Sequence, residues 1–151
     1  MRFKNAIIIF FLLITTNIFS QILVDDVGDG WKSKIDSALL LIKQTSPQHW
    51  DEVQKYCTHI TYWIGDFSTT TDSSTVMIST KDMRIVSINN LACVIIHEAH
   101  HLYIARNNIL LSVSSEELNC YLWENEFLKL LPNVEPWLRQ HVIRAIINYS
   151  E

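Results

Sequence analysis

The centre of the chain reads VIIHEAHHL over residues 94–102. Together with Leu91 and Ile104, its apolar residues recur at the three- and four-residue spacing of a helix with a buried face. Asn107 and Asn108 follow, and asparagine tolerates the left-handed conformation that commonly ends a helix. We therefore predict a helix from about residue 89 to residue 107, and the rest of the chain is interpreted around it.

The histidines of this helix form the pattern HExxH. His97 and His101 are four residues apart, which separates them by about 40° around a helix axis and projects both rings to one side. Two neutral imidazoles so placed can take two corners of a tetrahedral zinc ion. The apolar residues before His97 favour this interpretation over an accidental surface pattern, because buried imidazole nitrogens without partners are costly.

Glu98 lies beside the first predicted ligand, where its carboxylate can reach water on the open corner of the metal. Zinc lowers the pKa of bound water to about 7, and Glu98 can accept its proton and pass it to a leaving amine. His100 is an alternative partner for His97, but only the pairing with His101 leaves Glu98 in this arrangement. We expect His100 to point to the sheet or to solvent.

A catalytic zinc site needs a third protein ligand, with its fourth corner left to water. A metzincin would need Gly and His at positions that hold Ile104 and Asn107, so that class is excluded. The next acidic cluster is Glu116-Glu117, on a further predicted helix. A glutamate from that helix can return beneath the motif helix and complete the site.

With these residues the chain resembles the gluzincin metallopeptidases, especially their minimal one-domain bacterial forms. The resemblance covers about residues 75–131, and HExxH is its specific match. It implies a downstream helix with an ExxA-like pattern, in which Glu117 is the third ligand and Cys120 replaces the alanine. Glu116 is the second choice and Glu124 a further one. The chain also departs from the pattern in lacking the following Asp and in the short separation from His101.

Glu117 has a structural explanation as well. Ser114-x-x-Glu117 has the spacing of a capping box, in which the glutamate accepts from the backbone N–H of the capping residue. Both interpretations of Glu117 stay open at this point.

A hydrogen-bond donor to the oxyanion of a hydrolysed carbonyl can contribute a few kcal/mol to catalysis. Tyr103, Tyr121 and His141 are candidates, and His141 is preferred as a second catalytic residue. The alternative for His141 is a packed or exposed histidine without a catalytic role. His49 and His59 have no partner in the sequence and are interpreted as structural.

Four further helices are predicted from apolar spacing and from their end signals. Ser46-Pro47 is a capping residue followed by proline at the first helical position, and Pro132 and Pro136 separate the last two helices. These helices span residues 31–43, 47–57, 114–131 and 137–149.

Three strands are predicted before the motif helix. Residues 60–64 alternate between apolar and polar, and residues 68–74 form a polar loop. Two β-branched runs, 75–80 and 83–88, suggest a hairpin around Lys81-Asp82. The prediction is an α+β fold: a mostly helical, zincin-like domain over residues 21–151, with a small antiparallel sheet before the HExxH helix.

The first 20 residues read MRFKNAIIIFFLLITTNIFS. A positive start, an apolar run and a small residue at the end are typical of a secretory signal peptide. The apolar run is short for a membrane-spanning helix, although a retained anchor is the alternative. We expect an exported protein, periplasmic or extracellular, without membrane association once residues 1–20 are removed.

The net charge of the chain is −4, and removal of residues 1–20 takes away two of the 12 basic residues and none of the 16 acidic ones, leaving −6. An acidic chain without a basic run gives no electrostatic footprint for nucleic acid. The expected partner is a peptide or protein substrate, and the expected state is a monomer.

The cysteines are Cys57, Cys93 and Cys120. Their spacing excludes a CxxC zinc site. Export would permit one disulfide among them, and three small buried hydrophobic residues are an equally good description.

The sequence therefore leads to the hypothesis of a zinc-dependent peptidase or amide hydrolase. Zn²⁺ would be held by His97, His101 and Glu117, with Glu98 as general base. One alternative is a catalytically inactive zinc-binding interaction or immunity-like module, and another is a helical protein in which HExxH is accidental.

Overall fold

The computed structural model describes residues 21–71, 74–85 and 87–151. The predicted signal peptide, residues 1–20, lies outside them. No helix among the described residues is long and apolar enough to cross a membrane. In chain order the elements are β1 (Leu23–Val24), α1 (Trp31–Thr45), α2 (Pro47–Tyr56), β2 (His59–Trp63), β3 (Thr69–Thr71), β4 (Thr75–Ser79), α3 (Thr80–Arg84), α4 (Ile88–Arg106), α5 (Val113–Leu130) and α6 (Pro136–Ser150).

Ser46 joins the first two helices as predicted. Its backbone N–H ends α1 by donating to the Ile42 carbonyl at 2.9 Å. Its Oγ begins α2 by accepting from the His49 N–H at 3.5 Å, with Pro47 in the first helical position. One serine thus satisfies a free group at each of two helix ends.

The sheet is mixed and not antiparallel throughout. Its strand order is β1-β2-β4-β3, in which β1 and β4 both run parallel to β2 and only β3 is antiparallel to β4. The mostly helical α+β fold with a small sheet before the HExxH helix is confirmed.

The predicted hairpin of residues 75–80 and 83–88 is wrong, because the chain turns into α3 directly after β4. Ser79 Oγ accepts from the Asp82 N–H at 3.0 Å and donates to the Asp82 carboxylate at 2.8 Å. Such local capping favours a helix start over continued strand. The antiparallel partner of β4 is instead β3, three β-branched threonines inside the stretch predicted as a loop.

The motif helix α4 ends where the sequence predicted. Ser87 Oγ caps its start by accepting from the Asn90 N–H at 3.1 Å. Asn107 is the C-cap, and Asn108 follows in the left-handed region with φ 53°.

The start of α5 corrects the sequence interpretation. Its N-cap is Ser112, whose Oγ accepts from the Ser115 N–H at 3.2 Å. The capping box proposed for Ser114 and Glu117 is therefore wrong, since the helix begins before Ser114. The Glu117 side chain is not used to cap the helix.

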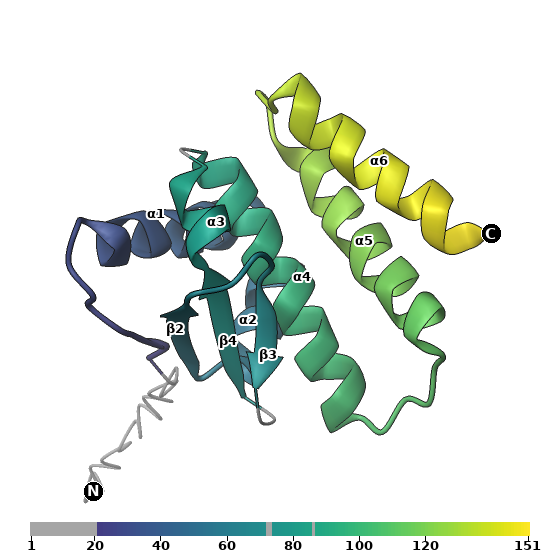
Figure 1. Ribbon diagram of the computed structural model, residues 1–151, viewed down its shortest axis with the longest axis horizontal. Coiled ribbons are helices and arrows are strands. Elements are labelled where there is room, and N and C mark those ends of the chain that lie inside the picture. Colours follow the sequence, from purple (N-terminus) through teal and green to yellow (C-terminus); the bar gives the residue numbers. More distant parts are fainter. Residues whose placement is uncertain (1–20, 72–73, 86) are drawn as a thin grey trace, which may run out of the picture.

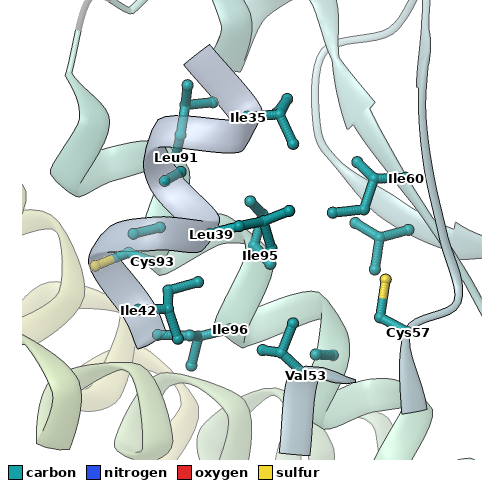
Figure 2. Packing of buried hydrophobic residues seen from close by; sticks show 14 of the residues in the cluster. Ile35, Leu39, Ile42, Val53, Cys57, Ile60, Leu91, Cys93, Ile95 and Ile96 are labelled. Carbon is teal, nitrogen blue, oxygen red and sulfur yellow. The ribbon is translucent and has the colours of Figure 1, made fainter. Parts of the chain in front are cut away.

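The motif helix lies between two layers. Figure 1 shows the sheet against one side of α4 and the antiparallel pair α5–α6 on the other, while α1 and α2 also pack on α4. The core beneath consists of buried aliphatic side chains (Figure 2): Ile35, Leu39, Ile42, Val53, Ile60, Leu91, Ile95 and Ile96. Burial of each such side chain contributes about 1.5–3 kcal/mol to folding.

All three cysteines lie within the described residues and are free, buried thiols. Cys57 and Cys93 occupy separate parts of the core (Figure 2). The description as small buried residues therefore holds, and the disulfide that export would permit is not formed.

Ile42→Ala tests the α1–α4 core. Ile42 is fully buried, so its truncation should lower the free energy of unfolding by about 2–5 kcal/mol through lost burial and a residual cavity. Leu40→Ala on the same helix is the control, because Leu40 is 53% exposed. Urea unfolding should separate the two variants, and equal losses would contradict the proposed core.

Candidate metal centre

The motif helix turns His97 and His101 towards α5, which lies beside it (Figure 1). The His97 ring is buried and the His101 ring is partly buried. Their centroids are 5.1 Å apart, with an angle of 63° between the planes. The four-residue spacing thus brings the two rings side by side.

Glu117 of α5 faces both rings. Its Oε2 lies 3.4 Å from His97 Nε2, and its Oε1 lies 3.5 Å from His101 Nε2. Donor atoms about 2.0 Å from one tetrahedral ion are separated by about 3.3 Å. Each Nε2 atom therefore lies at nearly the ligand-to-ligand distance from one oxygen of Glu117.

The opposite ring nitrogens contact two other carboxylates of α5. His97 Nδ1 lies 3.3 Å from Glu124 Oε2, and His101 Nδ1 lies 2.7 Å from Glu116 Oε1. Such contacts hold a ligating imidazole in one tautomer and orientation. Glu116 and Glu124, the other candidates for third ligand, therefore lie behind the rings, and Glu117 lies in front.

Acidic groups outnumber the imidazoles in this cluster. Burial lowers the pKa of His97, but hydrogen bonds with Glu117 and Glu124 outweigh that effect and raise the pKa to about 10. Without a cation, His97 carries a proton that partly balances the surrounding carboxylates. A divalent ion can replace that proton and supply more positive charge.

Glu98 is only 7% exposed, next to His97 in the chain. Burial raises the pKa of Glu98 to about 7, with His97 opposing the rise and Glu117 adding to it. A carboxyl group with such a pKa can both accept and return a proton near neutral pH.

Cys120 brings a further donor to the same place. His97, His101 and Cys120 each offer one ligand atom, and these atoms lie within 4.8 Å of one another. The two histidines and the cysteine form a cluster that could hold a metal ion, and the carboxylate of Glu117 faces both rings beside it.

The sequence predicted that His100 points to the sheet or to solvent. The structure corrects this prediction. His100 Nδ1 lies 2.8 Å from Glu52 Oε1 of α2, and its ring stacks on Tyr103 and on Trp123 of α5. It lines a groove of about 550 Å³ together with these two aromatic residues. Because α4 turns His97 and His101 towards Glu117, the neighbouring His100 points in another direction and packs between α2 and α5.

The oxyanion candidates are divided between two faces. The Tyr121 ring lies 4.4 Å from the His97 ring, and the exposed His141 on α6 lies 6.1 Å from Tyr121, both between ring centroids. Tyr103 packs instead against His100. Tyr121 is thus the nearest of the three to the metal face, and His141 lies behind it.

Two histidines interpreted as structural have local partners. His49 Nδ1 lies 2.7 Å from Ser46 Oγ, and its Nε2 lies 3.2 Å from the Trp123 carbonyl. His59 Nε2 lies 2.9 Å from Asp25 Oδ1. These three contacts explain both residues without the metal centre.

Sequence reasoning missed Cys120 as a donor and Glu124 as the partner of His97 Nδ1. A signal for Glu124 was present, since it follows Glu117 by seven residues, or two helical turns, and therefore shares its face. For Cys120 the corresponding signal was its three-residue spacing from Glu117.

No protein-family model, curated protein or solved structure gives a significant match to this chain.

Glu124→Gln should weaken Zn²⁺ binding about 10- to 100-fold, because the His97 ring loses its anionic partner while the metal-facing donors stay. Competition with a chromogenic chelator measures the affinity. Glu126→Gln on the same helix is the matched control, since Glu126 is exposed and pairs with Lys129. Equal Zn²⁺ affinities of these two variants would contradict the role of Glu124 in orienting the His97 ring.

Proposed function

We propose that this protein is an exported zinc-dependent peptidase or amide hydrolase, with His97, His101 and Glu117 as metal ligands. One observation carries the proposal: the Nε2 atoms of both imidazoles face one carboxylate at 3.4 and 3.5 Å. Imidazole and carboxylate donors are ligands that suit Zn²⁺. The carboxylates behind the rings match the outer partners of known zinc sites.

Bound Zn²⁺ would supply a Lewis acid that polarises a scissile carbonyl and acidifies water. Glu98 accepts the proton of the attacking water and delivers it to the nitrogen of the departing amine. Its burial and its pKa near 7 support this exchange, because a group that is half protonated at working pH can serve in both directions. His141, or Tyr121 in front of it, donates a hydrogen bond to the oxyanion.

Peptide is the preferred substrate because of the gluzincin resemblance. The arrangement of the sheet is compatible with it: β3 is an edge strand, and it packs beside α4. An extended peptide can add to such an edge through its backbone hydrogen bonds.

The second candidate is a zinc-binding interaction or immunity-like module without catalysis. The closeness of Cys120 favours it, because zinc sites with four protein ligands are structural in most proteins. Glu98 favours the enzyme, since a structural site has no use for a buried carboxylate that does not bind the metal.

Glu98→Gln separates the two functions. The amide keeps the shape of the side chain but accepts no proton, so stoichiometric zinc should remain while kcat/KM falls about 10²- to 10⁴-fold. The assay follows a pool of quenched-fluorescent peptides with zinc-loaded protein. Zinc-loaded wild type that cleaves no peptide in the pool would favour the binding module.

Elemental analysis of the ligand variants tests the metal assignment. His97→Ala, His101→Ala and Glu117→Gln should each hold less zinc than wild type after dialysis against a chelator, because each removes a direct ligand of the proposed site. Glu116→Gln should keep zinc, with reduced affinity. If Glu117→Gln keeps wild-type zinc and Glu116→Gln does not, Glu116 is the ligand.

A further inference from the structure

Cys120 lies on α5 one helical turn after Glu117 and is completely buried. Residues three apart on a helix share a face, and Glu117 shows which face this is, because its carboxylate contacts His97 and His101. The thiol of Cys120 is therefore carried to the same side of α5 as the proposed zinc ligand.

The two helices offer donors in pairs. On α4 the donors are four residues apart, and on α5 they are three apart, so each helix presents two to the space between them. The sulfur of Cys120 and one nitrogen of each imidazole lie within 4.8 Å of one another. A thiolate at about 2.3 Å and an imidazole nitrogen at about 2.0 Å from one tetrahedral ion are about 3.5 Å apart. Coordination of one ion would therefore require these atoms to move closer together.

Cys57 offers a contrast within the same protein. It is equally buried, but its Sγ donates to the His59 carbonyl at 3.4 Å. It therefore has a local structural partner, whereas Cys120 is grouped with two imidazoles.

We propose that Cys120 is a fourth protein ligand, so that the resting zinc site is a closed set of two histidines, a glutamate and a thiolate. This inference rests on the proposed function for the metal itself. When the ion binds, the S–H bond breaks, a sulfur–metal bond forms and the proton leaves to the buffer. Since thiolate is a soft donor, the site should prefer thiophilic ions such as Cd²⁺ over hard ones. Hydrolysis would then require water to replace the sulfur on the ion, with the displaced thiolate taking a proton from solvent.

Cobalt substitution tests the proposal without any activity assay. The purified protein is stripped with a chelator, loaded with Co²⁺ and recorded in the visible and near-ultraviolet. Wild type should show tetrahedral cobalt bands together with a near-ultraviolet sulfur-to-cobalt charge-transfer band. Cys120→Ala and Cys120→Ser should keep Co²⁺ and lose the charge-transfer band, and Cys57→Ala, the matched control, should keep both.

The same variants are titrated with Cd²⁺ and Zn²⁺ against a competing chelator. Cys120→Ala should lose affinity for Cd²⁺ by at least about tenfold, the lower end of the loss from an outer partner, and should lose more for Cd²⁺ than for Zn²⁺. Thermal unfolding of each metal-free variant confirms that it is folded.

The outcomes distinguish this inference from the proposed function. Cobalt bands that depend on His97 and His101 but are identical in wild type and Cys120→Ala would overturn the thiolate ligand and leave the zinc site standing. Failure of folded wild type to bind Co²⁺ or Zn²⁺ would overturn both.

Discussion

The contact between α4 and α5 is the constraint on which the rest of the site depends. Two imidazoles from α4 meet Glu116, Glu117 and Glu124 from α5, with each ring between a carboxylate in front and another behind. Charged groups brought into a protein interior lose hydration, and only close partners offset that loss. The helices must therefore hold their rotation and register, because a turn of either would leave the buried Glu124 and the His97 and His101 rings without their partners.

This constraint explains why a cation suits the site. Several carboxylates and only two imidazoles share a partly buried space. Burial lowers the pKa of His97, but hydrogen bonds with Glu117 and Glu124 outweigh that effect and raise the pKa, which favours a positive charge on that ring. A proton on one ring supplies a single positive charge, whereas a divalent ion held by the cluster would supply twice that charge. The donor set itself therefore favours a cation, independently of the HExxH motif.

The sequence predicted the helices well and the sheet less well, for physical reasons. The boundaries of α1, α2 and α4 follow from local signals such as Ser46-Pro47 and Asn107-Asn108, which act within one turn. The prediction of a strand at residues 83–88 was wrong because β-propensity depends on neighbouring strands, which a local sequence pattern does not reveal. Helical spacing within α4 was enough to predict that the rings of His97 and His101 lie side by side. Which of Glu116 and Glu117 faces the rings depends on the rotation of α5 about its own axis, which is set by packing.

Glu98 and Cys120 favour different coordination states of the proposed zinc site, one open to water and one closed. A thiolate in the fourth position completes the coordination and leaves no corner for water, while a buried carboxyl group beside His97 is useful only when water can bind. Desolvation makes Glu98 costly to keep buried, as its raised pKa shows. A purely structural site would gain stability from an apolar residue at position 98, so the glutamate argues for catalysis. The two residues are compatible if sulfur occupies the fourth corner at rest and water replaces it during turnover.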